Sequence, residues 1–122
     1  MTITSLLRRS LLVVAVAVAL PATASNLRFM KDSPLQYFTP EDTKMFKATL
    51  YEVLDKGADG EARKWSNPTT EANGEIKPTN SFARNGTPCR TLAISNSAKG
   101  LSASGRYNFC KPTATGKWTP AN

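Results

Sequence analysis

Two cysteines constrain the fold of this chain more than any other feature of its sequence. Cys89 and Cys110 stand on either side of Lys99-Gly100, a pair with the composition of a tight turn. If the two thiols face each other across one hairpin, the midpoint of that hairpin falls between Lys99 and Gly100. The same register gathers the apolar side chains of the hairpin on one face and the cysteines on the other. We therefore predict a β-hairpin centred on this turn and closed by a Cys89–Cys110 disulfide.

The N-terminal segment has the composition of a secretory signal peptide. Arg8 and Arg9 precede an unbroken run of Leu, Val and Ala at residues 11–20. Residues 22–24 then read Ala-Thr-Ala, a small-residue pattern that predicts cleavage after Ala24. A transmembrane anchor is the alternative interpretation. However, an apolar run of this length spans only about 15 Å as a helix, which is half of a bilayer core.

Export would also explain the cysteines. Removal of residues 1–24 leaves no transmembrane span and lowers the formal charge from +7 to +5, because two arginines are lost. A chain of this size buries only about two-thirds of its unfolded surface, so a covalent link is valuable. An oxidising compartment allows Cys89 and Cys110 to pair, and closing their loop contributes about 3 kcal/mol. Two free thiols would instead require a reducing cytosol.

The composition limits the chemistry that the chain can perform. It contains no histidine, which removes Ser-His-Asp and Cys-His catalysis and any histidine-bound metal. Two cysteines are too few for a four-cysteine zinc site or an iron–sulfur cluster. We therefore expect no catalytic residues, no metal and no cofactor, and we interpret the protein as non-enzymatic.

One helix is predicted, at residues 40–56. Thr39 is a suitable N-cap, and Pro40 at the first helical position loses no hydrogen bond there. Gly57 follows the last turn and is expected to adopt a left-handed capping conformation. The apolar stripe that this helix should bury consists of Phe46, Leu50, Val53 and Leu54.

The chain beyond Gly57 alternates turn residues with short segments of strand composition. Consecutive short strands joined by short links indicate an antiparallel meander. The fold class is therefore α+β, with the helix packed on a four- or five-stranded antiparallel sheet. The expected strands lie near residues 61–66, 75–83, 89–96, 102–110 and 116–119.

The hairpin that precedes the cysteine hairpin raises a register problem. A two-residue turn at Asn85-Gly86 would set Phe82 opposite Cys89, on the face away from the core. We therefore expect a three- or five-residue loop there, with Gly86 in a bulge. The predicted core comprises the helix stripe together with Trp65, Ile76, Phe82, Leu92, Ile94, Tyr107, Phe109 and Trp118.

Short motifs follow one another in a characteristic order over residues 57–119. They are W-x-N-P from Trp65, G-x-I-x-P from Gly74, C-R at Cys89, G-x-x-x-x-C-K from Gly105, and G-x-W from Gly116. In order and spacing they resemble the C-terminal domain of the rickettsial 17 kDa surface-antigen family of bacterial envelope proteins. The lipoprotein cysteine and the glycine zipper of many family members are missing here.

The resemblance implies a small exported domain, either periplasmic or associated with the outer membrane and cell surface, and it specifies no mechanism. Together with the other signals it suggests three segments. These are a cleaved signal peptide at residues 1–24, an extended lead-in at 25–39, and one surface-antigen-like domain at 40–122.

Five side chains are candidates for binding. Arg90 and Lys111 each follow a cysteine, and with Arg106 they are expected to form a basic patch at one end of the sheet. Such a patch would attract an anionic envelope component, such as lipid or lipopolysaccharide phosphates, or an envelope protein. A solvated surface is the alternative. Trp65 and Trp118 either fill the core or form an aromatic contact with a sugar or peptide.

Two other functions compete with envelope binding. A secreted inhibitor or immunity-type protein would use a rigid loop, for which residues 68–74 are the best candidate. A small hydrolase would need carboxylates facing a cleft, or a Ser-Lys pair. The carboxylates considered for such a hydrolase are Glu52, Asp55, Asp59 and Glu61. Nucleic acid is not an expected partner of an exported chain.

Overall fold

The structure, a computed structural model, describes residues 33–121, so the predicted signal peptide and most of the lead-in lie outside the described residues. A short 3-10 helix, η2, precedes one α-helix and five strands that form a single antiparallel sheet in sequence order. The predicted α+β class is therefore confirmed. The bounds are η2 Pro34–Tyr37, α1 Pro40–Lys56, β1 Arg63–Ser66, β2 Asn73–Arg84, β3 Thr87–Ala98, β4 Leu101–Cys110 and β5 Thr119–Ala121.

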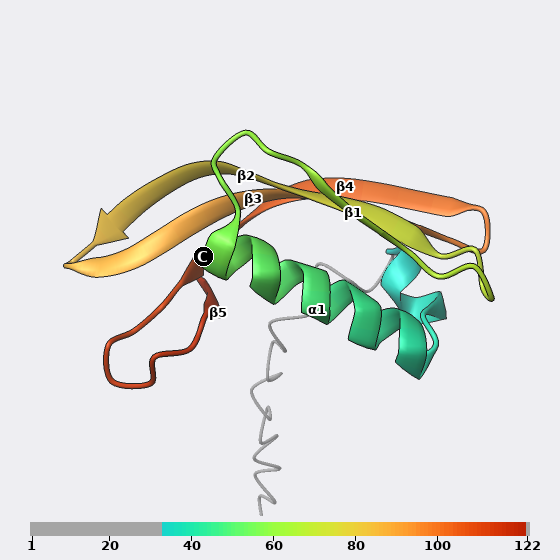
Figure 1. The fold of residues 1–122 in the computed structure, drawn as a ribbon, viewed down its shortest axis with the longest axis horizontal. Coiled ribbons are helices and arrows are strands. Elements are labelled where there is room, and N and C mark those ends of the chain that lie inside the picture. Colours follow the sequence, from blue (N-terminus) through green and yellow to red (C-terminus); the bar gives the residue numbers. More distant parts are fainter. Residues whose placement is uncertain (1–32, 122) are drawn as a thin grey trace, which may run out of the picture.

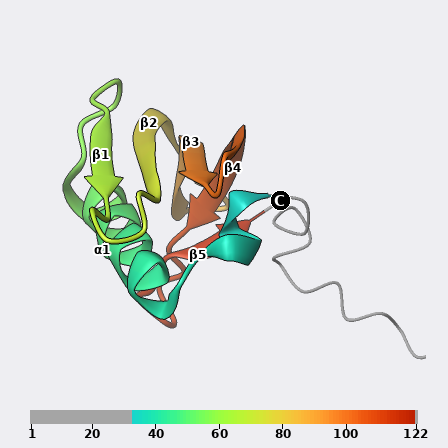
Figure 2. The same ribbon diagram turned by 90° about the vertical axis from the view of Figure 1, so that its right-hand side faces the viewer.

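The helix and the sheet form two layers (Figures 1 and 2). α1 lies across one face of the sheet and packs mainly on β1 and β2, while η2 lies against β3 and β4. Within residues 33–121, no helix covers the other face. No helix in this part of the chain is both long enough and apolar enough to cross a membrane.

Both ends of α1 fall where the sequence predicts them. At the first turn, the Thr39 hydroxyl accepts a hydrogen bond from the Asp42 N–H at 3.2 Å, and the Asp42 carboxylate accepts one from the Thr39 N–H at 2.9 Å. This reciprocal pair satisfies two donors that a helix start leaves free. At the last turn, the left-handed conformation expected for Gly57 is wrong, because its φ is −68°.

Glycine is required at position 57 because the Val53 carbonyl oxygen lies close to its Cα, and not because of its backbone conformation. A methyl group on its Cα would lie 2.7 Å from the Val53 carbonyl oxygen. The Gly57 N–H still donates to the Val53 carbonyl, and the guanidinium of Arg90 supplies further donors to the carbonyls at this helix end. The chain can therefore leave the helix in an extended conformation.

The β3–β4 hairpin has the predicted register. Cys89 pairs with Cys110 and Leu92 with Tyr107, and the two strands turn at Lys99 and Gly100. Both turn residues have a positive φ, as a two-residue hairpin turn of type I′ requires. The Cys89–Cys110 disulfide is present on the face away from α1.

The β2–β3 hairpin differs from the prediction in its turn and in its register. Its turn has only two residues, Asn85 and Gly86, so the expected longer loop is wrong. A bulge at Thr79 adds one residue to β2, which reverses the alternation of side chains beyond that point. As a result Phe82 does pair with Cys89, lies on the outer face and is absent from the core.

The core otherwise follows the helix stripe and the inward faces of the strands. Leu50, Tyr107 and Trp118 are partly buried members of it, and sequence analysis missed Ala72 and Ala98. The lead-in is not extended at residues 34–37, because Ser33 caps a 3-10 turn that begins at Pro34. The predicted core residues that are buried are Phe46, Val53, Leu54, Trp65, Ile76, Leu92, Ile94 and Phe109.

Candidate functional site

Arg90 of β3 connects the sheet to the end of α1 through hydrogen bonds. Its guanidinium donates hydrogen bonds to the carbonyls of Val53 at 2.8 Å, Leu54 at 3.1 Å and Gly57 at 2.6 Å. A further bond reaches the carboxylate of Asp59 at 2.8 Å. This contact lowers the pKa of Asp59 below its usual value. Only 11% of the Arg90 side chain remains exposed, so most of its hydrogen-bonding capacity is already occupied.

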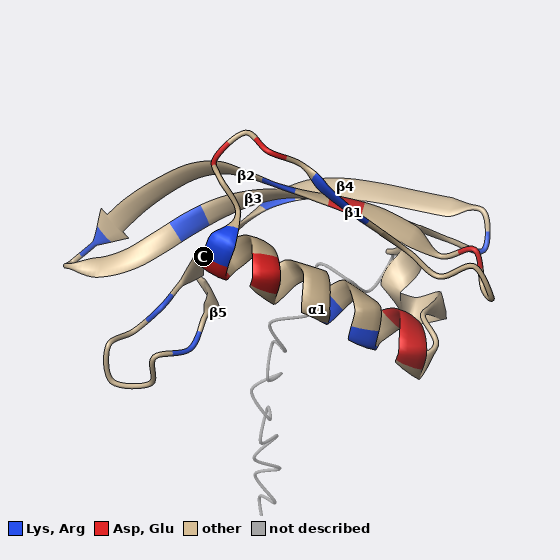
Figure 3. Ribbon diagram, viewed as in Figure 1, with Lys and Arg blue, Asp and Glu red and all other residues tan. Residues whose placement is uncertain are grey.

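The three basic residues predicted to form one patch take different positions. Arg106 is exposed and pairs with Ala93 on the face away from α1, whereas Arg90 points toward the helix. Lys111 follows the end of β4 and places its ammonium 5.9 Å from the ring centre of Trp118. Figure 3 shows Lys and Arg spread over the strands, α1 and the β4–β5 loop.

The two tryptophans have different environments. Trp65 is 5% exposed, and its indole N–H donates to the Asn96 side chain at 3.2 Å, which is core packing with a satisfied polar atom. Trp118 is partly exposed and precedes β5, since this strand begins later than predicted. Its indole N–H donates to Asp55 of α1 at 2.9 Å, which ties the β4–β5 loop to the helix.

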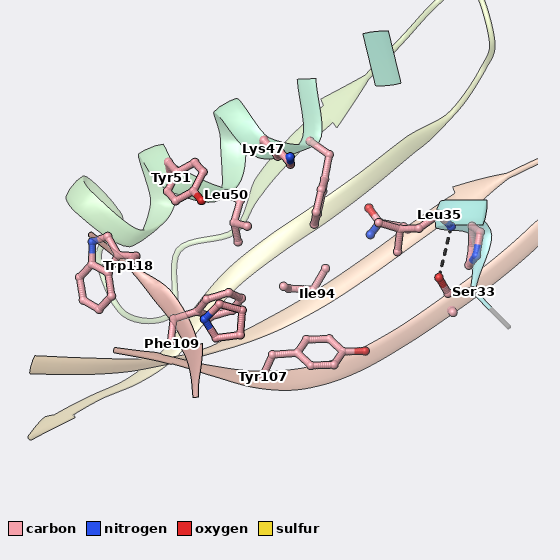
Figure 4. Close-up of a pocket in the computed structure, with 14 residues that line it drawn as sticks. Ser33, Leu35, Lys47, Leu50, Tyr51, Ile94, Tyr107, Phe109 and Trp118 are labelled. Atoms are coloured by element: carbon pink, nitrogen blue, oxygen red, sulfur yellow. Dashed lines mark hydrogen bonds between the residues drawn. The ribbon is translucent and has the colours of Figure 1, made fainter. Parts of the chain in front are cut away.

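An apolar cleft of about 180 Å³ opens between α1 and the last three strands (Figure 4). It exists because α1 packs on β1 and β2 and leaves the same face of β3 and β4 partly uncovered. Leu50 and Tyr51 contribute from the helix, Tyr107 and Phe109 from β4, and Trp118 from the loop before β5.

The cleft is large enough for a small apolar group. A dry cavity of about 150 Å³ in a protein core holds a benzene molecule, and this cleft is slightly larger. Tyr51 is 48% exposed at its mouth. Among the described lining residues, Lys47 is the only charged one.

The carboxylates of the predicted cluster point to different elements. Glu52 forms an ion pair with Arg63 of β1, Asp55 binds Trp118, and Asp59 binds Arg90. Each of these three carboxylates therefore has a structural partner, and they do not converge on one point of the cleft. Glu61, the fourth member of the cluster, is exposed before β1. The arrangement does not resemble the paired carboxylates of a glycosidase.

A buried carboxylate outside that cluster organises the β1–β2 loop. Asp42 is 1% exposed and accepts hydrogen bonds from Thr70 at 2.6 Å and Asn67 at 2.8 Å. Burial by itself raises the pKa of Asp42. The hydrogen bonds from Thr70, Thr39 and Asn67 outweigh that effect and keep the pKa below its usual value. The loop considered for an inhibitor is therefore anchored to the start of α1.

A comparison with protein-family models assigns the chain. The model of the 17 kDa outer membrane surface antigen matches residues 52–119, which is more than half of the sequence. The chain belongs to this family. No curated protein and no solved structure matches it significantly. The assignment confirms the resemblance read from the motifs and places the chain among envelope surface proteins.

The boundaries of the match divide the cleft of this surface antigen. The matched segment contains the walls built from β3 and β4 and the Trp118 ring. The wall from Phe46 to Tyr51, including Lys47, lies before the match begins at Glu52. Sequence analysis did not find the cleft, because Leu50, Tyr107 and Trp118 all read as core residues. The exposed Tyr51 beside the apolar stripe was the available signal.

Proposed function

We propose that this surface antigen is a non-enzymatic binding domain of the bacterial envelope, which holds an apolar group of another envelope component in the cleft. The cleft itself is the observation that carries the proposal. It is open to solvent, walled by aromatic side chains and built on a rigid layer of helix and sheet. Ligand pockets in proteins typically have this apolar, concave character.

The location of the protein forms the second part of the proposal. The A-x-A signature before Ser25 supports export through a cleaved signal peptide, and the disulfide suits an oxidising compartment. We propose that the processed chain resides in the periplasm or at the outer membrane. The family assignment is consistent with either place.

The absence of histidine supports the non-enzymatic part of the proposal, as does the pairing of the carboxylates near the helix end. The basic residues contribute unequally. Arg90 is engaged by the helix carbonyls, and Arg106 lies on the opposite face of the sheet. Lys111 stands beside Trp118 and is therefore the member of the predicted patch that lies near the cleft.

The test uses N-phenyl-1-naphthylamine, a neutral apolar dye that brightens when it leaves water. We expect the wild-type protein to bind the dye at one site per chain. Ala103→Trp should abolish this binding, because Ala103 lines the cleft and a large ring there fills it. Ala83→Trp is the matched control, since Ala83 is another exposed strand alanine, at the far tip of the β2–β3 hairpin.

Two outcomes would contradict the proposal. The wild-type protein could fail to bind the dye, or the Ala103→Trp and Ala83→Trp variants could bind it equally well. Thermal unfolding of both variants checks that each retains the fold.

A further inference from the structure

We propose that the ligand of the cleft is an anionic amphiphile with a single alkyl chain. Its tail would occupy the apolar cleft, and its carboxylate or phosphate head would lie among lysines on the rim. This inference rests on the proposed function and specifies the chemical class of the ligand.

The lining selects a hydrocarbon tail. Ile94 and Phe109 form the floor, Leu50 stands on the helix side, and the Trp118 ring closes one end (Figure 4). A cleft that is slightly larger than a benzene-sized cavity accepts about eight carbon atoms of one extended chain. A volume of about 180 Å³ suits a single chain of this length.

An extended peptide is the rival occupant. β5 pairs with β4 only over Asn108–Cys110, so the outer edge of β4 from Leu101 to Arg106 has no strand partner within the described residues. However, a peptide inside the cleft would place amide groups against apolar walls, and unpaired amides are costly to bury. The amide oxygen of Asn96 at the wall already accepts the Trp65 N–H. A chain without amide groups suits this lining better.

The rim selects a negative head group. Lys47 lines the cleft, and the Lys111 ammonium lies 5.9 Å from the Trp118 ring centre. Neither lysine forms an ion pair within residues 33–121, whereas Arg63 and Arg90 do. Lys47 on the wall and Lys111 beside the Trp118 ring, neither of them ion-paired in the described part of the chain, create a positive potential near the end of the cleft where a head group would emerge.

One acidic residue modifies this picture. Asp55 accepts the Trp118 N–H and therefore lies at the same end of the cleft as Lys111. Its charge offsets part of the Lys111 field. Lys47 lies about 12 Å from Asp55 along the helix axis, two turns nearer the start of α1. The Asp55 charge therefore reduces the positive potential of Lys47 less than that of Lys111. We therefore expect Lys47 to contribute more than Lys111 to head-group binding.

The experiment compares head groups on one tail by displacement of N-phenyl-1-naphthylamine. Decanoate, decanol and decyltrimethylammonium share the alkyl chain and differ in charge. We expect decanoate to displace the dye at about three- to tenfold lower concentration than decanol, and the cation to be weakest. In a series from hexanoate upward, affinity should rise about fourfold per methylene until the cleft is full and level off afterwards.

Charge-matched variants locate the effect. Lys47→Gln with Lys111→Gln should remove the preference for decanoate over decanol. The control pair Lys64→Gln with Lys77→Gln removes the same charge from the face away from α1 and should retain the preference. High salt should weaken decanoate binding and leave decanol binding unchanged.

The outcomes separate the two proposals. If the dye binds but decanoate and decanol displace it equally, or if both variant pairs behave alike, the anionic head group is wrong and the apolar binding site stands. If an acetylated, amidated peptide of alternating Leu and Ser displaces the dye at lower concentration than decanoate, the occupant is a peptide. If the dye does not bind at all, the proposed function itself fails.

Discussion

Arg90 is the side chain on which the packing of α1 depends most directly. It reaches from β3 to the carbonyl oxygens of Val53, Leu54 and Gly57 at the end of the helix, of which that of Val53 also accepts the Gly57 N–H. Planar guanidinium groups suit such a contact because they offer several donors in fixed directions. Arg90 therefore acts as a helix C-cap supplied by a distant strand.

Replacement of Arg90 should destabilise the fold strongly. We expect Arg90→Met to lower the free energy of unfolding by about 2 to 4 kcal/mol, because the helix carbonyls lose their donors near the protein interior. Arg90→Lys should be intermediate, since one ammonium cannot reach all of them. Urea unfolding measures the change, with Arg106→Met as a control that should cost less than about 0.5 kcal/mol. Equal stability of the Arg90→Met and Arg106→Met proteins would contradict this role.

Asp42 makes the stability depend on pH. Its pKa in the folded protein lies below the ordinary value of 3.8, so the carboxylate stabilises the fold fully above about pH 4. This contribution is lost as the pH falls through the lower folded pKa. Asp42→Asn should lose about 2 to 3 kcal/mol at neutral pH and show a smaller acid loss than wild type. Urea unfolding from pH 2 to 7 measures both effects.

Glu41→Gln is the control for Asp42, since it removes a charge from the same helix turn at an exposed position. Its acid profile should match that of the wild-type protein. An Asp42→Asn protein with an unchanged acid profile would show that another group titrates.

These two residues differ in how far the sequence reveals them. Thr39 and Asp42 have the spacing of a capping box, so the local contact could be predicted from the sequence alone. The bonds from Asn67 and Thr70 could not, because they depend on the path of a loop more than twenty residues away. Arg90 could not be assigned for the same reason. An arginine after a cysteine reads as a surface charge until the helix end is placed beside it.

Hairpins are the elements whose register the sequence determines best. The Cys89–Cys110 pair and the Lys99-Gly100 turn both constrain the same hairpin, and the structure agrees with both. The β2–β3 hairpin lacks a covalent constraint, and its bulge at Thr79 leaves no compositional mark. The alternation of apolar residues fails to reveal such a bulge, because either a longer turn or an extra strand residue restores the pattern.

Removal of the disulfide should weaken the β3–β4 hairpin without changing its register. Cys89→Ser with Cys110→Ser should lower the free energy of unfolding by about 3 kcal/mol, chiefly through the unfolded chain. The control is Ser97→Ala with Ser102→Ala, another facing pair of the same hairpin, which should cost less than about 1 kcal/mol. Hydrogen exchange of the strand amides follows the register, and a shifted protection pattern would contradict it.

The whole molecule differs from its predicted form mainly in how the layers meet. A helix on one face of the sheet could be predicted from its apolar stripe, but its lateral position could not. α1 sits over β1 and β2 because the Trp65, Phe46 and Phe38 rings pack edge to face at that side. The cleft is the space that this off-centre position leaves over β3 and β4.

Processing of the whole chain is testable by mass. Expressed with its N-terminal segment in a bacterium, the protein should be recovered from the exported fraction with Ser25 as its first residue. Its mass should also be two hydrogens below that of the reduced chain, since the disulfide forms after export. Ala24→Glu should block cleavage and retain the longer form with the membrane fraction. A wild-type product that starts elsewhere would contradict the predicted site.

The Trp65 indole and the Asn96 amide meet directly above Gly74. Any side chain at Gly74 would overlap the Trp65 Nε1 atom and the Asn96 side chain. A substitution at one of these positions therefore changes which side chains the other two positions can accommodate. A Cβ at position 74 would also lie 2.6 Å from the Ser95 carbonyl oxygen, which is backbone. Among surface antigens of this family, we therefore expect glycine at position 74 wherever tryptophan and asparagine occupy positions 65 and 96.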